Sequence, residues 1–256
     1  MQYRNELKHL ITPGDRAAIC ATMKAVARLD PHAGAKGYYT IRSLYFDNIA
    51  DKALREKIDG VNEREKFRIR YYDGNTSVIH LEKKVKRDGV GYKVSCDLTA
   101  EEARRIVDGD TLWMATDKRG LVVELYAKMK SQGLRPKTIV DYERIPFVYG
   151  PGNVRVTVDY NIRFALVYPQ LRAAEGTGHS TQALNSLSQP QGADLNSLRC
   201  TDFLNPACVT IPASGNDIIL EVKWDDYLPT VIRHAVQLKG RRQQAFSKYA
   251  QCRIYG

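Results

Sequence analysis

The chain has 256 residues, of which 43% are hydrophobic, and it carries a formal net charge of +10. This length and apolar content fit one large domain or two small ones with a sizeable core, and they exclude an intrinsically disordered chain. The positive charge indicates an anionic partner such as nucleic acid, a membrane surface or a polyanion.

The sequence shows no pattern typical of a membrane span, a signal peptide or a disulfide framework. No stretch approaches the roughly 20 apolar residues that a membrane-spanning helix requires. The first residues, MQYRNELKHLITPGD, lack the apolar core of a secretory signal peptide. The five cysteines are an odd number without CxxC spacing, which predicts reduced thiols and no disulfide framework or zinc site. We therefore expect a soluble, cytoplasmic protein.

The first third of the chain alternates between strand and helix patterns. Residues 4–10 (RNELKHL) alternate like a strand, and a helix follows with Asp15 as its expected cap. Residues 37–48 are rich in β-branched and aromatic side chains, which favours a strand. A short charged helix is expected at 50–58.

Two hairpins are predicted in the middle of the chain. The strand at 64–72 is joined to the strand at 77–86 by the turn Tyr72-Asp73-Gly74-Asn75. A second turn, Arg87-Asp88-Gly89, joins that strand to the one at 91–96.

The remaining elements complete an α+β pattern in a single domain of about eight strands. Thr99 and Glu102 form a capping-box pattern at the start of a helix. Residues 172–217 are rich in Ser, Gly, Asn, Gln and Pro, which predicts a long surface loop. The other expected elements are helices at 118–132, 228–239 and 242–250 and strands at 138–150, 153–166 and 217–224.

The sequence REKFRIRYY at 64–72 alternates cations with apolar residues. Because successive side chains of a strand point to opposite faces, the cations share one face and the apolar residues share the other. The ordinary interpretation is a sheet with a buried apolar face and a solvated charged face. The alternative is that the charged face lines an interior. The cations are Lys66, Arg68 and Arg70, and the apolar residues are Phe67, Ile69 and Tyr71.

Four further strand patterns also mix basic and acidic residues on one face. If helices packed outside cover the apolar faces, the charged faces must enclose a shared lumen. This arrangement is a closed or nearly closed antiparallel barrel, although a flat sheet with a solvated face would show the same alternation. The residues are Arg4, Glu6 and Lys8; His80, Glu82, Lys84 and Lys86; Arg155, Thr157 and Asp159; and Glu221 and Lys223.

Such a lumen would suit phosphate oxygens together with a divalent cation. Arginine grips phosphate with paired donors and lysine acts as a compact charge, while carboxylates supply the oxygen ligands of Mg²⁺ or Mn²⁺. Neither GxxxxGK[ST] nor GxGxxG occurs, so a glycine-rich phosphate loop is excluded.

Nine short motifs then follow one another in the order found in a known family. On these motifs the chain resembles the VTC domain, the polyphosphate polymerase domain of the vacuolar transporter chaperone complex, within the triphosphate tunnel metalloenzymes. The resemblance covers nearly the whole chain outside 172–217. The motifs are RxExK at 4–8, RSLYFDN at 42–48, KxRxR at 66–70, LEKK at 81–84, GYK at 91–93, YERIPF at 142–147, VRVTVD at 154–159, LEVK at 220–223 and FSKY at 246–249.

The resemblance implies an eight-stranded antiparallel β-tunnel that binds ATP and inorganic polyphosphate or triphosphate, with Mn²⁺ or Mg²⁺ as cofactor. It implies transfer of the γ-phosphoryl group of ATP to a growing polyphosphate chain. The implied site residues are Arg68, Arg70, Lys84 and Lys248 for catalysis; Lys8, Lys93, Arg144, Arg155, Lys66, Lys223 and Arg4 for substrate binding; and Glu221, with Glu6 and Glu82 as weaker candidates, for the metal. The first motif departs from the ExExK of the wider superfamily, since Arg4 stands in place of one carboxylate.

Two points stay open at this stage. A metal-dependent triphosphatase or polyphosphatase would use the same pocket with water as the acceptor, and a non-catalytic polyanion-binding module would use its cations alone. The sequence also leaves open whether Arg144 or Arg155 contacts the phosphates. No nucleic acid is expected, because the strand cations alternate with packing residues rather than with aromatic stacking surfaces.

Overall fold

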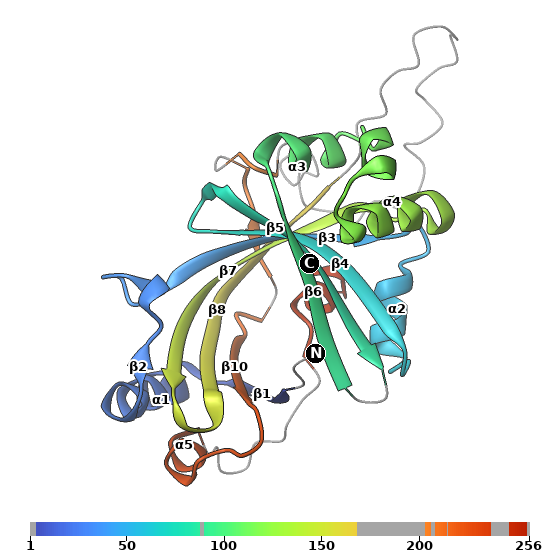
Figure 1. Ribbon diagram of the computed structural model, residues 1–256. Coiled ribbons are helices and arrows are strands. Elements are labelled where there is room, and N and C mark those ends of the chain that lie inside the picture. The colour runs from blue at the N-terminus through green and yellow to red at the C-terminus, as the bar shows by residue number, and fades with distance from the viewer. Residues whose placement is uncertain are drawn as a thin grey trace, which may run out of the picture.

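The computed structural model describes residues 4–87, 90–167, 203–205, 208–213, 215–236 and 246–254. Eight antiparallel strands follow one another in the sheet order β1-β10-β8-β7-β3-β4-β5-β6, and the sheet curls into a half-barrel (Figure 1). Two short strands extend it, β2 beside β7 and β9 beside β8. The strands are β1 (Asn5–Ile11), β2 (Arg28–Leu29), β3 (Tyr39–Asp47), β4 (Arg64–Tyr72), β5 (Asn75–Arg87), β6 (Val90–Leu98), β7 (Arg135–Tyr149), β8 (Val154–Leu166), β9 (Ile211–Pro212) and β10 (Ile218–Trp224).

The α+β class and the eight-stranded antiparallel sheet are confirmed, but the closed barrel is not. Within the described residues, the edge strands β1 and β6 do not pair with each other, so the sheet ends as an open half-barrel. Closure requires the strand number, tilt and stagger to match around the whole ring. The alternation of residues within one strand carries no information on strand number, tilt or stagger. The sequence therefore predicted the charged face of each strand, but it did not predict that the barrel stays open.

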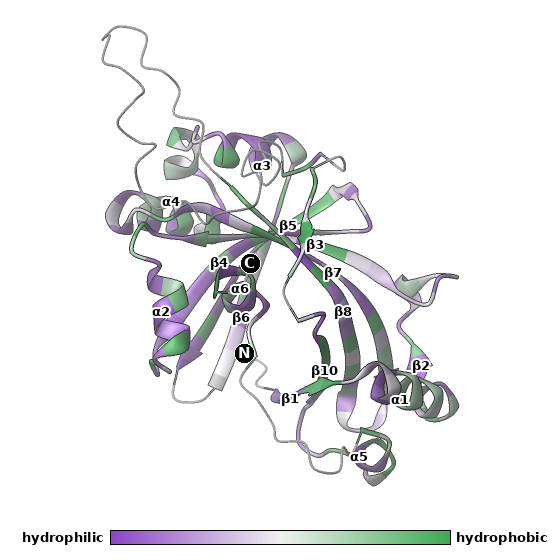
Figure 2. Cartoon of the chain, turned by 180° about the vertical axis from the view of Figure 1, so that it is seen from behind, coloured by the Kyte–Doolittle hydropathy of each residue, from purple (hydrophilic) through white to green (hydrophobic). Residues whose placement is uncertain are grey.

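Two apolar clusters cover the convex face of the sheet. One packs α3 and α4 against residues such as Phe67, Ile69 and Leu81, and the other packs α1 and α5 against β8 and β10. Figure 2 shows the resulting bands of hydrophilic and hydrophobic residues along β7 and β8. The helices are α1 (Pro13–Val26), α2 (Lys52–Ile58), α3 (Ala100–Val107), α4 (Gly120–Gln132), α5 (Thr230–Val236) and α6 (Lys248–Ile254).

Helix α6 is an exception to the expectation that helices pack outside. Its residues Tyr249 and Cys252 belong to a third cluster with Tyr45 and Tyr142, whose side chains point to the concave side. The helix therefore fills part of the half-barrel interior. It begins at Lys248, later than the expected 242, and Ser247 accepts a bond from the backbone N–H of Ala250 at its start.

Local signals place most of the helix starts and turns. Thr12, not Asp15, is the N-cap of α1, and Asp15 completes the capping box from the third helical position. The Thr99–Glu102 capping box is confirmed. The turn between β4 and β5 has positive φ at Asp73 and Gly74 (49° and 69°), as a two-residue hairpin turn requires.

Several expectations fall wholly or partly outside the described residues. Of the expected helix at 228–239, α5 covers Thr230–Val236, and the rest of it after 236 is not described. The expected surface loop at 172–217 is described only from 203, where Phe203 and Leu204 are buried in the core and β9 pairs with β8. Phe203 and Leu204 are therefore packed in the core, whereas Val209 is 63% exposed, and the surface loop stays a prediction for the rest of the segment.

Two further observations concern the cysteines and the membrane. Cys208 is disulfide-bonded, so the expectation that every thiol is reduced is wrong for this residue. Cys20, Cys96 and Cys252 are free thiols. None of the helices in the described part of the chain has the length and apolarity needed to cross a bilayer.

Adjacent residues of β5 provide a test of this layering. Ile79 is fully buried in the convex-face cluster, whereas Val78 is 49% exposed. We expect Ile79→Ala to lower the free energy of unfolding by about 2–5 kcal/mol, because it leaves a cavity. Val78→Ala should change it by less than about 0.5 kcal/mol. Denaturant unfolding of both variants measures this, and equal losses would contradict the assignment of faces.

Candidate phosphate-binding site

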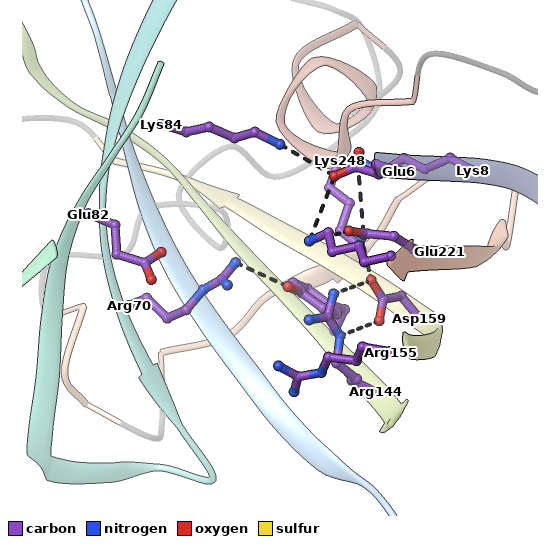
Figure 3. Close-up of polar contacts among 12 residues, drawn as sticks. Glu6, Lys8, Arg70, Glu82, Lys84, Arg144, Arg155, Asp159, Glu221 and Lys248 are labelled. Atoms are coloured by element: carbon purple, nitrogen blue, oxygen red, sulfur yellow. Dashed lines mark hydrogen bonds and ion pairs between the residues drawn. The ribbon is translucent and has the colours of Figure 1, made fainter. Parts of the chain in front are cut away.

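The concave face holds a polar cavity of about 420 Å³. Its wall combines strands from both ends of the sheet with the residues that begin α6. All fourteen residues proposed from the sequence line this cavity, although the role of each one stays a prediction. They are Arg4, Glu6, Lys8, Lys66, Arg68, Arg70, Glu82, Lys84, Lys93, Arg144, Arg155, Glu221, Lys223 and Lys248. Figure 3 labels several of them, among them Glu6, Glu82 and Glu221.

The alternation in β4 explains how these cations reach one interior. Lys66, Arg68 and Arg70 line the cavity, while Phe67 and Ile69 between them are fully buried in the convex-face cluster. Because one face of the strand is held by apolar packing, its cations are committed to the other face. The charged face therefore lines a cavity and is not an ordinary solvated surface.

Glu82 is the counter-ion at the β4–β6 end of the cavity. One carboxylate oxygen accepts from Arg68 Nε at 2.6 Å, and the other accepts from Lys93 Nζ at 2.6 Å. Burial would raise the pKa of Glu82, but Arg68 and Arg70 hold it well below its usual range. Glu82 is thus ionised and has both oxygens engaged by cations.

Glu6 and Glu221 form a second acidic centre at the β1–β10 end. Lys8 Nζ lies 2.5 Å from Glu6 and 4.0 Å from Glu221, and Lys223 Nζ lies 2.5 Å from Glu221 and 3.7 Å from Glu6. Burial would raise the pKa of Glu221, but Lys223 and Lys8 hold it well below its usual range. Two carboxylates thus share two lysines.

The metal set expected from the resemblance does not come together as three ligands. Among the described residues, no three His, Cys, Asp or Glu side chains form a group that could hold a metal ion. Glu6 and Glu221 share their lysines, whereas Glu82 is engaged elsewhere by Arg68 and Lys93.

One ion pair crosses the open side of the half-barrel. Lys84 of β5 lies 3.7 Å from Glu6 of β1, although the edge strands β6 and β1 form no backbone ladder. Glu6 is therefore in contact with cations from both rims of the opening (Figure 3).

Asp159 is a charged centre to which the sequence analysis assigned no role. It is fully buried and accepts two bonds from Arg144, Nε at 2.6 Å and Nη2 at 2.7 Å, while Lys248 Nζ lies 2.6 Å away. Burial would raise the pKa of Asp159, but Arg144 and Lys248 lower it. Its place on the charged face with Arg155 was visible in the sequence, but its partners were not: Arg144 stands opposite it on β7, and Lys248 comes from the distant helix α6.

Helix α6 delivers Lys248 to this centre. Tyr249 donates a hydrogen bond to Asp47 at 2.6 Å, and Arg253 donates to Asp51 at 2.9 and 3.0 Å. Since both partners lie outside α6, these bonds fix the helix and hold the Lys248 ammonium in the cavity wall. Lys248 also lies 4.6 Å above the Tyr142 ring.

Two buried tyrosines that the sequence analysis did not select support the arginines of β4. Tyr45 accepts a bond from Arg68 at 3.2 Å, and Tyr142 accepts one from Arg70 at 3.1 Å. Burial would raise the pKa of Tyr45, but Arg68, with Lys66 and Arg70, lowers it to about 7. Burial lowers the pKa of Lys66 to about 7. Only the pairing of the two strands could have indicated Tyr45, because it stands opposite Arg68 in the sheet.

The buried Asp159 centre provides a test of stability. We expect Asp159→Asn to lower the free energy of unfolding at pH 7 by about 3–5 kcal/mol, because Arg144 and Lys248 lose their buried counter-ion. The folded-state pKa of Asp159 is depressed, so its stabilisation is present above the unfolded value of about 3.9 and is lost as pH falls. The difference between wild type and variant should therefore narrow in acid.

Denaturant unfolding between pH 3 and pH 7 measures this effect. The control is Asp97→Asn, because Asp97 is 82% exposed and pairs only with His80 in the described structure; its loss should stay below about 1 kcal/mol. Similar losses for the two variants would show that Asp159 is not a counter-ion for buried cations.

Comparison with known proteins places the chain in a family. Among solved structures, it is similar to a putative adenylate cyclase from Bacillus halodurans, with 13% identity over 91% of this chain and 84% of that chain and a TM-score of 0.43. A protein from Pyrococcus horikoshii OT3 shows 12% identity over 93% and 92% of the two chains with a TM-score of 0.41. No curated protein matches the chain. The family model described as the VTC domain matches residues 3–254, and the chain therefore belongs to the VTC domain family.

Proposed function

We propose that this protein is a metal-dependent polyphosphate polymerase that transfers the γ-phosphoryl group of ATP to a growing inorganic polyphosphate chain. The observation that carries the proposal is the cavity wall, where eleven lysines and arginines stand against three glutamates. This excess of positive charge in a confined space is suited to a ligand with one negative charge on each of several linked phosphates. Membership of the VTC domain family supports the same ligand class.

The arrangement of donors favours linked phosphates over nucleic acid. Cations approach the cavity from strands at both ends of the sheet and from α6, so they surround a ligand instead of forming a flat platform. The tyrosines beside them are used for support, since the hydroxyls of Tyr45 and Tyr142 accept bonds from arginines. Base stacking would need exposed aromatic faces, and both of these tyrosines are buried.

Arg155 is better placed than Arg144 for direct phosphate contact. Arg144 is held by both oxygens of the buried Asp159. Arg155 bonds Asp30 and Tyr39 through Nη2, while its buried Nε has no hydrogen-bond partner in the described structure. We therefore assign Arg155 to phosphate binding. We assign Arg144 to the wall of the cavity as a positive charge that Asp159 holds in place.

A divalent cation fits the acidic centre formed by Glu6 and Glu221. Mg²⁺ is commonly held by one or two carboxylates together with substrate phosphates, and these two carboxylates share Lys8 and Lys223 as partners. Glu221, the more buried of the two, would be the principal ligand. When bound, Mn²⁺ or Mg²⁺ supplies neutralisation of charge on the phosphate oxygens.

The residues of the cavity supply positioning and charge. Phosphoryl transfer requires little covalent chemistry from the protein, so catalysis depends on alignment and on stabilising charge at the non-bridging oxygens. Arg68, Arg70, Lys84 and Lys248 stand in the wall from three separate elements and can contact one phosphate group from different sides. A polyphosphate end is already anionic, so it needs no general base to attack.

A triphosphatase is the second candidate, and one observation favours it specifically. Tyr45 and Lys66 both have pKa values lowered to about 7. A water nucleophile must lose a proton, and a group that titrates near the working pH is suited to accept it. The same cavity would then release free phosphate instead of extending a chain.

Adjacent lysines of β5 provide a test of activity. Lys84 lines the cavity, whereas Lys83 lies on the other face and pairs with Glu124 at 2.5 Å. We expect Lys84→Ala, Arg68→Ala and Glu221→Ala each to lower turnover of ATP with Mn²⁺ by on the order of 100-fold or more, because each removes charge that stabilises the transition state. Lys83→Ala should retain activity within about threefold.

The assay resolves polyphosphate on a gel and measures free phosphate in parallel. Polyphosphate chains that disappear in the cavity variants support the polymerase, and free phosphate without chains supports the triphosphatase. Binding of polyphosphate with neither product would leave a non-catalytic binding module. Thermal unfolding of each variant shows whether a loss of activity reflects a loss of fold.

Ligand binding should also take up protons. At pH 8 the unliganded cavity holds a largely neutral Lys66 and a largely ionised Tyr45, since both pKa values are about 7. A bound polyanion raises both pKa values, so protons are taken up and affinity falls as pH rises from 6 to 8. Calorimetric titration with inorganic tripolyphosphate in two buffers of different ionisation enthalpy counts these protons. Lys66→Met should reduce the count and Lys83→Met should not.

A further inference from the structure

Thr157 is a buried residue of the cavity wall with an unused hydroxyl group. It lies on β8, its side chain lines the cavity, and it is 3% exposed. Within the described residues, its Oγ1 has no hydrogen-bond partner. Buried hydroxyl groups are nearly always hydrogen-bonded, because an unpaired one loses its bonds to water without replacement. An unpaired hydroxyl in a cavity wall therefore points to a ligand.

The neighbours of Thr157 identify the chemistry of that ligand. In register, Thr157 stands between Glu221 on β10 and Pro146 on β7. The carboxylate of Glu221 is engaged by Lys223 at 2.5 Å and also faces Lys8. Proline has no N–H and no polar side-chain atom to offer. Neither cross-strand neighbour is thus bonded to the hydroxyl of this cavity-lining residue.

A second unused donor lies on the same face of the same strand. The Nε of Arg155, two residues before Thr157, is buried without a hydrogen-bond partner in the part of the chain that the structure describes. A neutral hydroxyl donor and a guanidinium N–H on one strand face would suit adjacent oxygens of one anion. Phosphate presents such oxygens and accepts from both kinds of donor.

We propose that Thr157 is a further binding residue of the cavity and that its hydroxyl donates a hydrogen bond to a non-bridging oxygen of the bound phosphate chain, beside the Nε of Arg155. The inference rests on the proposed phosphate function of the cavity. It adds a neutral contact to a site otherwise built from charges. Because salt screens charges but not a neutral hydrogen bond, the contribution of Thr157 should be the same at low and high ionic strength.

The chain offers a matched control in Thr138. Thr138, on β7, is fully buried and its Oγ1 also lacks a hydrogen-bond partner among the described residues, but Thr138 does not line the cavity. Thr→Val replaces the hydroxyl by a methyl group of similar size. The two substitutions therefore remove the same buried group at a cavity position and at a core position.

The experiment is calorimetric titration of the full chain with inorganic tripolyphosphate in the presence of a metal chelator. We expect Thr157→Val to weaken binding by on the order of tenfold, at 50 mM and at 300 mM salt alike. Thr157→Ser should bind within about threefold of wild type, since it retains the hydroxyl, and Thr138→Val should bind like wild type. The melting temperature of Thr157→Val should not fall, because no hydrogen bond within the protein is lost.

Each result decides a separate point. If wild type and Thr138→Val bind tripolyphosphate neither with the chelator nor with Mn²⁺, the proposed function is wrong and the inference falls with it. If wild type binds and Thr157→Val binds equally well, only the inference is wrong. A loss seen with Mn²⁺ but not with the chelator would place the hydroxyl at the metal and overturn the phosphate contact. If Thr157→Val does not fold, Thr157→Ala takes its place with the same expected loss.

Discussion

Mutual repulsion among eleven lysines and arginines on one concave face is the constraint on which the rest of this structure depends. Four carboxylates offset it from inside, and each is shared by at least two cations. Glu82 serves the β4–β6 end, Glu6 and Glu221 serve the β1–β10 end, and Asp159 serves the cations brought by β7 and α6. The carboxylates are outnumbered, so the cavity keeps an excess of positive charge that a polyanion can neutralise. The same feature thus costs stability without a ligand and provides affinity with one.

The energy that holds these charges together comes from the opposite face of the sheet. Fully buried residues such as Phe67, Ile69 and Leu220 pack under α3 and α4 or under α1 and α5. Burial of apolar surface is favourable at roughly 25 cal/mol per Å², and it is lost if a strand shifts register by one residue. Apolar packing outside therefore enforces the crowding of cations inside, and the strands cannot relax the repulsion by turning over.

Within the described part of the chain, helix α6 and the open side are the two boundaries of the cavity that contain no strand ladder. Side-chain bonds to Asp47 and Asp51 hold α6 within the half-barrel, and an ion pair between Lys84 and Glu6 crosses the gap between the sheet edges. The contacts of α6 include the apolar packing of Tyr249 and Cys252 as well as polar bonds, and the contact across the gap is an ion pair. A ligand that competes for Lys84 or Lys248 would therefore act directly on the contacts that close the cavity.

The sequence by itself determined the strands, the turn between β4 and β5, the Thr99 capping box and the side on which each strand carries its charge, because these depend on neighbours within a few residues. It also determined which cations share one face of a strand, since alternation and apolar packing leave them one available side, whereas the tertiary structure decided that these faces line one cavity. Only the tertiary structure decided that the barrel stays open, that α6 lies inside it, and that Asp159 joins Arg144 to Lys248. It also decided that Glu82 is bound to Arg68 and Lys93, away from the other two glutamates. These facts depend on strand stagger and on contacts between residues far apart in the chain, and no local pattern encodes either.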